Sequence, residues 1–268
     1  MLSFTYPFNL RSFNMNKKKY TIAQILPALN TGGVERGVVE ISKALVENNF
    51  KSIVISSGGH MVSQITRNGG IHYALNVHSK NPLKWPKIRN QLKIILESEN
   101  VDLIHFCSRA PAWIGVPLGA ILDIPIITSV HMRFRKSNFL KKYYNSILTK
   151  GNSIIAISKH IEESIKNSFP KESKKIKIIH RGVDLDLFNP AKINPARIIA
   201  QSKHLNLKDN VPVIIMAARP AMWKGYQVLI RALSKVNHDF QCVLIGAGDG
   251  NKNFQNSLIR KIIQTKLE

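Results

Sequence analysis

The chain has 268 residues with a formal net charge of +23, and its content of 44% hydrophobic and 7% aromatic residues excludes a wholly disordered chain. Only Cys107 and Cys242 are present, so the composition excludes a disulfide framework and a cysteine-based metal site and favours a reducing cytosol. The positive charge favours polyanionic partners: nucleic acid, anionic lipid or phosphorylated substrates.

Residues 1–19 are expected to form a flexible leader. The apolar part of this segment contains Pro7, Asn9 and Arg11, and its lysines follow the apolar part. This is the wrong order for a secretion signal. A start at Met15 is the alternative interpretation. No apolar run further along approaches the roughly 20 residues that a membrane-spanning helix needs.

From Tyr20 onward, short β-rich runs alternate with helix-length amphipathic segments. This alternation predicts an α/β fold: a Rossmann-like, doubly wound parallel sheet with helices on both faces, over residues 20–189. After a polar, proline-bearing passage the rhythm restarts, which predicts the beginning of a second Rossmann-like domain over residues 190–268. The expected strands are 21–26, 52–56, 72–76, 103–107, 126–130, 153–157, 177–180, 213–217 and 242–245. The expected helices include 34–47, 86–97, 138–149, 159–167, 226–233 and a segment from about Asn253.

The first expected strand leads into Gly32 and Gly33, directly before a helix. Free backbone amides at a helix N-terminus, with no side chain in the way, can hold a phosphate group. The alternative is an ordinary strand-to-helix turn that needs glycine for a positive φ angle. Because the pattern is not a full dinucleotide fingerprint, both interpretations stay open.

Two cations follow the first strand of the second domain. Arg219 ends the strand, and Lys224 precedes the next helix. Ligands bind at the carboxyl edge of open α/β sheets, so this pair could clamp a diphosphate; the alternative is two solvated surface cations. The next strand runs into Gly246, Gly248 and Gly250, which form either a turn that a nucleotide can approach or simply a loop.

His131 follows the strand 126–130 at its carboxyl end, where it could hydrogen-bond a substrate hydroxyl or orient a leaving group. His105, inside a strand, is interpreted as structural. Residues 132–150 are rich in Lys, Arg and aromatic residues and contain no acid. This segment either lies on an anionic membrane or is a surface helix whose aromatic face is in the core.

Taken in order, five segments resemble the GT-B fold glycosyltransferases of family 4, the retaining group 1 enzymes. They are NTGGVERGVVEISKAL, TSVHMRFR, IIHRGVDLDLFNP, AARPAMWKGYQVLIRAL and VLIGAGDG. The resemblance covers the chain from about Tyr20 to its end. It implies two Rossmann-like domains and transfer of a sugar from a nucleoside-diphosphate sugar with retention at the anomeric carbon.

The resemblance also implies roles for the residues named above. Gly32 and Gly33 would line the site near the donor diphosphate, and His131 would lie by the donor sugar at the reaction centre. Arg219 and Lys224 would hold the diphosphate and stabilise the leaving group.

The turn that flanks the nucleotide is matched by Gly246, Gly248 and Asp249. Arg181 stands in the segment between the domains, where many members of the family have Asn. No metal or other cofactor is expected, because cations and helix dipoles would neutralise the departing diphosphate.

The implied partners are a nucleotide-sugar donor and a glycan or lipid-linked acceptor of the lipopolysaccharide core type. The expected location is the cytoplasm, with peripheral contact to the inner face of the membrane through 132–150. The family's Glu-x7-Glu element, which binds the donor sugar and ribose, has no counterpart before residue 268, so we expect no transfer by residues 1–268 alone. The alternatives are an epimerase or phosphorylase on the same scaffold, a non-catalytic acceptor- or membrane-binding remnant, and a basic nucleic-acid-binding protein. For the last of these, no helix-turn-helix, zinc-finger or RNP pattern is present.

Overall fold

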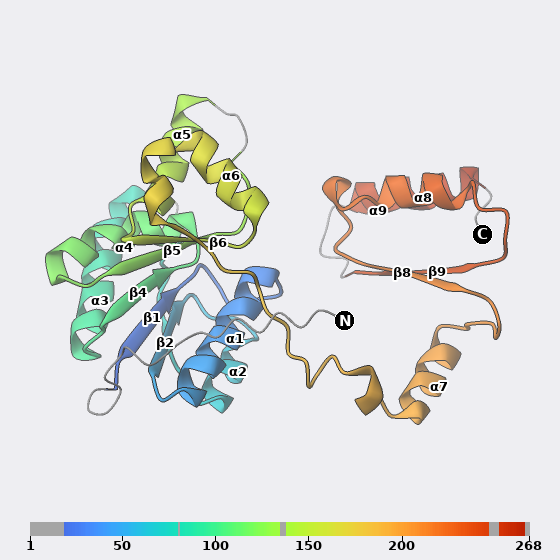
Figure 1. Cartoon of the computed structure of the whole chain (residues 1–268), viewed down its shortest axis with the longest axis horizontal. Coiled ribbons are helices and arrows are strands. Elements are labelled where there is room, and N and C mark those ends of the chain that lie inside the picture. Colours follow the sequence, from blue (N-terminus) through green and yellow to red (C-terminus); the bar gives the residue numbers. More distant parts are fainter. Residues whose placement is uncertain (1–18, 80, 135–137, 247–251, 266–268) are drawn as a thin grey trace. The chain divides into compact units, whose positions relative to one another are not determined.

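The computed structural model describes residues 19–79, 81–134, 138–246 and 252–265. The chain divides into two compact units, Met1–Val183 and Asp184–Glu268, here called the N-terminal and C-terminal units (Figure 1). The domain boundary placed by the sequence at Pro190 lies a few residues further along the chain. The leader falls almost wholly outside the described residues.

A seven-stranded parallel sheet forms the centre of the N-terminal unit. Its strand order is β3-β2-β1-β4-β5-β6-β7, so the direction of winding reverses between β1 and β4. This is a doubly wound α/β fold, as the sequence predicted. The strands are β1 (Thr21–Ile25), β2 (Lys51–Ser56), β3 (Ile71–Ala74), β4 (Leu103–Phe106), β5 (Ile126–Val130), β6 (Ser153–Ala156) and β7 (Ile176–Ile178).

Helices follow most of these strands and cover both faces of the sheet (Figure 1). The expected helix over 138–149 is shorter than predicted, because the α-helix ends at Ser146 and a 3-10 turn continues to Thr149. The helices are α1 (Gly33–Glu47), α2 (Val62–Arg67), α3 (Trp85–Ser98), α4 (Arg109–Leu122), α5 (Phe139–Ser146) and α6 (Lys159–Ser168), with 3-10 turns η2 (Pro82–Lys84), η3 (Ile147–Thr149) and η4 (Pro170–Lys175).

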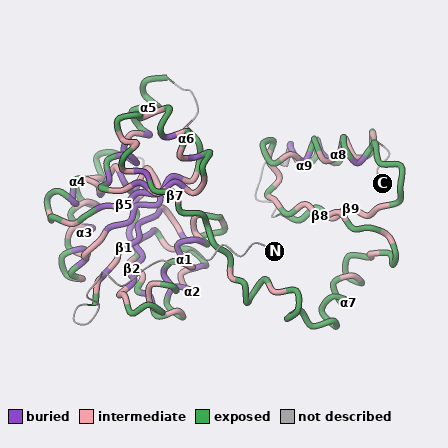
Figure 2. Tube along the Cα trace, in the orientation of Figure 1, coloured by how far each residue is buried: buried purple, intermediate pink, exposed green. Residues whose placement is uncertain are grey.

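The sheet has an apolar core on each side, because alternate strand residues point to opposite faces. One core joins the strands to α3 and α4 and includes Phe106. The other joins Val54 and Cys107 to Val38 and Val39 of α1. Buried residues gather in the central strands of this unit (Figure 2).

Gly115 lies where α4 packs tightly against the sheet. A Cβ at this position would lie 2.5 Å from Cζ of Phe106 and 3.1 Å from Cδ2 of Leu92, and both side chains are fully buried. Gly115→Ala is therefore expected to lower the free energy of unfolding by about 1–3 kcal/mol through overpacking. On helix propensity alone, alanine would stabilise by about 1 kcal/mol. Urea unfolding followed by circular dichroism measures the change, and a raised midpoint would contradict this packing.

The C-terminal unit contains a parallel pair of strands, as the sequence predicted, with Val213 aligned to Gln241. The passage interpreted as a polar connector contains a helix, α7, whose first turn is capped by the side chain of Asn194. The elements are η5 (Pro190–Lys192), α7 (Pro195–His204), β8 (Val213–Ala217), η6 (Met222–Lys224), α8 (Tyr226–Leu233), β9 (Gln241–Ile245) and α9 (Lys252–Gln264).

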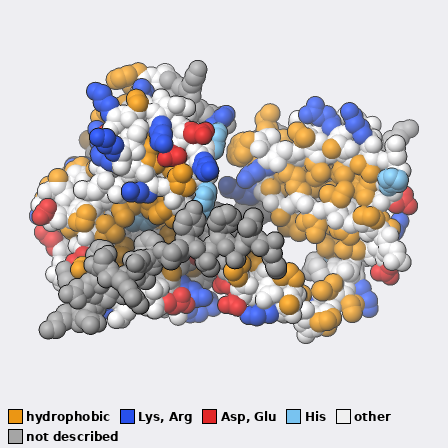
Figure 3. Space-filling model, in the orientation of Figure 1, with side chains coloured by type: hydrophobic (Ala, Val, Ile, Leu, Met, Phe, Trp, Pro, Cys, Tyr) orange, Lys and Arg blue, Asp and Glu red, His pale blue; other side chains and the backbone are white. Residues whose placement is uncertain are grey.

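The core of the C-terminal unit is small. It consists of Tyr226, Ile230, Phe254 and Leu258, which α8 and α9 contribute. Alternate residues of β8 point away from these helices, and Ile215 among them is 61% exposed. Figure 3 shows hydrophobic side chains gathered on this unit. A two-stranded sheet with one bare apolar face has little stability of its own.

Candidate functional site

The turn between β1 and α1 does not need glycine for a positive φ. Gly32 has a φ of 176°, which is extended backbone that any residue adopts, and Gly33 already belongs to the helix. A Cβ on Gly32 would lie 2.9 Å from Cδ of Glu35, whose carboxylate folds back over the helix start. The positive-φ interpretation of this turn is therefore wrong.

His131 lies directly after β5 with both ring nitrogens buried and without a hydrogen-bond partner. Burial, with a smaller contribution from the charge of Arg181, lowers the pKa of His131 to about 4. The ring is therefore neutral at pH 7, with one nitrogen able to donate and the other able to accept. A buried polar group normally has a partner, so this imidazole is available to a ligand.

His105 is a structural residue in this fold, in agreement with the interpretation of the sequence. It is buried on β4, and its Nε2 lies 2.6 Å from Oγ of Ser129 on β5. Burial first, and His131 second, lower the pKa of His105 to about 4. A neutral ring can share one proton with the serine hydroxyl, which satisfies both groups inside the sheet layer.

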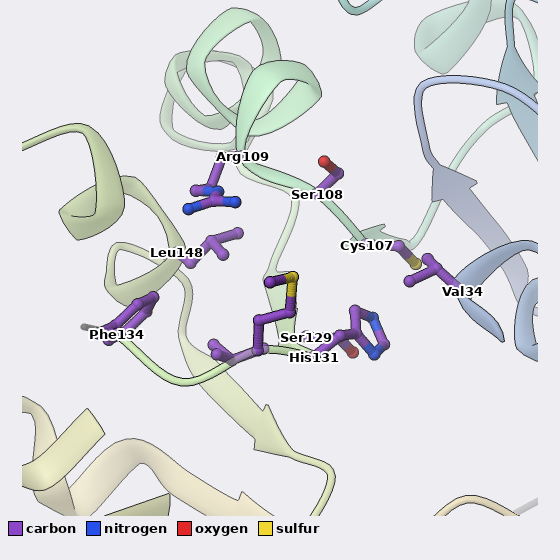
Figure 4. A pocket seen from close by; sticks show the side chains of 10 residues that line it. Val34, Cys107, Ser108, Arg109, Ser129, His131, Phe134 and Leu148 are labelled. Atoms are coloured by element: carbon purple, nitrogen blue, oxygen red, sulfur yellow. The ribbon is translucent and has the colours of Figure 1, made fainter. Parts of the chain in front are cut away.

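A pocket with a volume of about 120 Å³ opens beside His131 (Figure 4). The N-terminus of α4 forms one wall with Arg109, whose Nη1 donates to Oδ1 of Asn145 at 2.6 Å and whose guanidinium lies over the ring of Tyr144. Burial raises the pKa of the Cys107 thiol to about 12, so this wall carries no thiolate. The lining residues are Val34, Cys107, Ser108, Arg109, Ser129, Val130, His131, Met132, Phe134 and Leu148.

In the C-terminal unit, Arg219 and Lys224 flank the exposed loop that leads from β8 to α8. The loop is anchored by Tyr226, which is buried and whose hydroxyl donates to the carbonyl of Ala218. Gly246, after β9, packs closely against the same carbonyl group of Ala218. A Cβ on Gly246 would lie 3.0 Å from the carbonyl carbon of Ala218. The carboxyl ends of β8 and β9 are thus held together next to the two cations.

The predicted residues fall into two groups by unit. Gly32, Gly33 and His131 belong to the N-terminal unit, and Arg219, Lys224 and Gly246 to the C-terminal unit. Gly248 and Asp249 lie outside the described residues. Within the described ranges, no group of three or more His, Cys, Asp or Glu residues is placed to hold a metal ion.

Arg181 is the residue whose place in the site the sequence reasoning missed. Its guanidinium lies against the first turns of α1, where a Cβ on Gly33 would be 3.7 Å from Nη1 and a Cβ on Gly37 would be 2.6 Å from Cζ. Glycines four residues apart share one face of a helix, so the spacing of Gly33 and Gly37 was the signal that could have located it.

Comparisons with known proteins agree with this architecture. The sequence profile described as Glycosyltransferase Family 4 matches residues 31–187. A glycosyltransferase from Rickettsia africae is 36% identical, with a TM-score of 0.83 over 94% of this chain and 66% of that chain. HepE of Anabaena, solved with UDP-glucose, is 18% identical, with a TM-score of 0.77 over 92% of this chain and 66% of HepE. The lipopolysaccharide outer core galactosyltransferase WaaB is 14% identical, with a TM-score of 0.62 over 92% of this chain and 66% of WaaB.

These solved neighbours are GT-B glycosyltransferases, so the predicted fold type is confirmed. The chain spans 60% and 61% of the length of two curated relatives that it matches, a spore coat protein of Bacillus subtilis and a glycosyltransferase of Methanocaldococcus jannaschii. Among the described helices, none has the length and apolar content needed to cross a membrane.

Proposed function

This chain belongs to glycosyltransferase family 4, and we propose on that basis that it acts in the transfer of a sugar from a nucleoside-diphosphate sugar, with retention at the anomeric carbon. The observation that carries the proposal is the exposed loop after β8, where Arg219 and Lys224 stand beside two strand ends held together by Tyr226 and Gly246. Fixed cations at strand ends suit a diphosphate.

In the N-terminal unit, the neutral imidazole of His131 supports the same reaction. Its two ring nitrogens can donate to and accept from sugar hydroxyls. The pocket beside it is too small for a whole nucleotide sugar, so it would take only part of one. No metal is required in this proposal, because Arg219, Lys224 and helix N-termini supply the positive charge that the departing diphosphate needs.

A panel of nucleotide sugars tests the proposal. UDP-glucose is the first candidate, because it is bound by the similar protein HepE. Each donor is added to the purified chain, and the shift in melting temperature is measured with and without magnesium. Stabilisation by one nucleotide over the others, unaffected by a chelator, is the expected result. Failure of every nucleotide sugar to raise the melting temperature would refute donor binding.

For the acceptor, we propose an envelope glycan or lipid-linked sugar reached at the cytoplasmic face of the membrane. Similarity to WaaB supports an envelope glycan, and the surface of α5 supports the membrane. Phe139 and Leu140 are 79% and 72% exposed, and Lys141 and Lys142 beside them are exposed too. Exposed aromatic and aliphatic side chains next to lysines suit the interface of an anionic bilayer. The alternative in which the aromatic face of 132–150 lies in the core does not hold at Phe139.

Flotation with lipid vesicles is expected to distinguish α5 from other apolar surface residues. Phe139→Ser combined with Leu140→Ser should lower the fraction bound to phosphatidylglycerol vesicles at least about tenfold, since each buried apolar side chain is worth roughly 1.5–3 kcal/mol. Leu83→Ser is the control, because Leu83 is 89% exposed and belongs to η2, a different element from α5. Equal loss of binding in both proteins would refute a membrane role for α5.

A nucleic-acid-binding protein is the second candidate, and only the net charge of +23 favours it. Binding to DNA that falls steeply with salt and is unaffected by nucleotide sugars would support that candidate. Vesicle binding without stabilisation by any nucleotide sugar would instead indicate a non-catalytic remnant that holds acceptor or membrane.

A further inference from the structure

We propose that Arg181 is a phosphate-binding residue of the N-terminal unit, held in a slot that Gly33 and Gly37 leave open on α1. The inference rests on the proposed function only for the identity of the molecule that carries the phosphate.

The slot is defined by missing side chains. Gly37 is a buried residue of α1, and a Cβ on it would overlap the guanidinium of Arg181, 2.6 Å from Cζ and 3.3 Å from Nε. Gly33, one turn earlier on the same face, faces Nη1 at an ordinary contact distance of 3.7 Å. Any larger residue at 37 would force the guanidinium out of the slot.

Arg181 is an exposed residue, and its guanidinium lies where an anion from solvent can reach it. The N-terminus of α1 carries a partial positive charge, and a guanidinium beside it raises the local potential further. Glu35, the acidic residue in the first turn, folds its carboxylate over Gly32. None of the ion pairs formed by the described residues includes Arg181. The guanidinium is therefore free to bind an anion from outside the chain.

His131 points to the same conclusion. Both of its ring nitrogens are buried and unpaired, and the charge of Arg181 helps to lower its pKa. The guanidinium offers up to five N–H donors in a planar fork, and a neutral imidazole adds a sixth. A phosphate group can accept hydrogen bonds from two donors of this planar fork at once, which a single sugar hydroxyl matches less well.

Two substitutions separate a ligand-binding arginine from a loose surface charge. Arg181→Gln removes the cation and should weaken binding of inorganic pyrophosphate about tenfold or more. Gly37→Ala keeps the cation but fills the slot, and it should weaken binding to a similar extent. Its melting temperature should hold or rise, since alanine favours helix and only the end of a flexible side chain must move. In the double variant the two effects should not add.

The control is Lys177→Gln, which removes one positive charge from an exposed position of β7. It should change pyrophosphate affinity by less than about twofold at constant ionic strength. Affinities are measured on the whole chain by calorimetry and by the nuclear magnetic resonance signal of the His131 ring. If Gly37→Ala binds pyrophosphate like the unsubstituted chain, or Arg181→Gln like Lys177→Gln, the proposal fails. It also fails if the unsubstituted chain binds no pyrophosphate.

Two further probes identify the source of the phosphate. UDP-glucose represents the donor diphosphate, and glucose 6-phosphate represents a phosphorylated acceptor. Loss of affinity for UDP-glucose alone assigns Arg181 to the donor, and loss for glucose 6-phosphate alone assigns it to the acceptor; either result supports the proposal. Arg181-dependent binding of pyrophosphate without binding of any nucleotide sugar would uphold this inference and refute the proposed function.

Discussion

Arg219→Ala and Lys224→Ala are each expected to lower the rate of sugar transfer about 100-fold or more, the cost of removing one fixed group that stabilises charge in a transition state. Both side chains are exposed on a loop whose ends are fixed by the Tyr226 hydroxyl and by the close contact of Gly246 with Ala218. Because the loop is already fixed, its backbone loses little entropy when the two cations bind a diphosphate. Removing it should therefore affect catalysis far more than folding.

The assay has to take account of the small sheet in the C-terminal unit. Residues 1–268 alone are expected to show no transfer, since the sheet of the C-terminal unit has two strands and an exposed apolar face that includes Ile215. The chain is therefore co-expressed with the part of the Rickettsia africae glycosyltransferase that it does not cover. Release of nucleoside diphosphate from the donor panel then measures transfer by the assembled protein.

Lys235→Ala provides the charge-matched control, because Lys235 is exposed in the same unit but follows α8 and lies away from the strand ends. It should change the rate less than about twofold. If the Lys235 variant loses as much activity as the Arg219 variant, the effect comes from net charge and the diphosphate role is refuted. Lys224→Arg should recover part of the rate, since the charge is retained.

The sheet of the N-terminal unit could be predicted because its strands are nearly continuous apolar runs, as buried parallel strands are. Helices that lie in polar stretches of sequence are harder to predict. The helix α7 begins at Pro195 inside a passage rich in polar residues, and none of its residues is buried. Its start depends on the Asn194 cap and not on an apolar stripe, so hydrophobic periodicity could not identify it.

The candidate site was predictable only where the chain order itself placed residues at strand ends, as for His131 and Arg219. Arg181 is different, because its contact with Gly37 joins segments far apart in the sequence. The lack of a side chain at Gly37 indicates a contact only when the residue that fills the space, here Arg181, is known. Burial of both His131 ring nitrogens likewise depends on the packing around β5, which no local pattern records.

The stability of the N-terminal unit is expected to fall sharply between pH 7 and pH 4. His105 and His131 have pKa values lowered to about 4, in both cases mainly by burial. In the unfolded chain, an imidazole has a pKa of about 6.5. Between these two pKa values each histidine is protonated in the unfolded chain and neutral in the folded protein. The free energy of unfolding therefore decreases as the pH falls.

The size of the effect follows from the shift. The free energy of unfolding has its full value well above pH 6.5. Each histidine lowers it by about 2 kcal/mol at pH 5 and by about 3 kcal/mol once the pH is below 4. The groups that face the two rings do not reverse this sign. The Ser129 hydroxyl stays neutral, and the Cys107 thiol, with a pKa raised to about 12, stays protonated. Arg181 is positive throughout and opposes protonation of His131.

Urea unfolding at pH 7.5 and pH 5.0, followed by the fluorescence of Trp85 and Trp113 in a Trp223→Phe background, measures the difference. His105→Gln keeps a polar group near Ser129 but cannot take up a proton, so it should remove about 2 kcal/mol of the pH dependence. His160→Gln, at an exposed position of α6, controls for the loss of an imidazole as such. If His105→Gln unfolds with the same pH dependence as the unsubstituted chain, His105 takes up its proton inside the folded sheet. Burial would then not keep this ring neutral, and the same argument applied to His131 would lose its support.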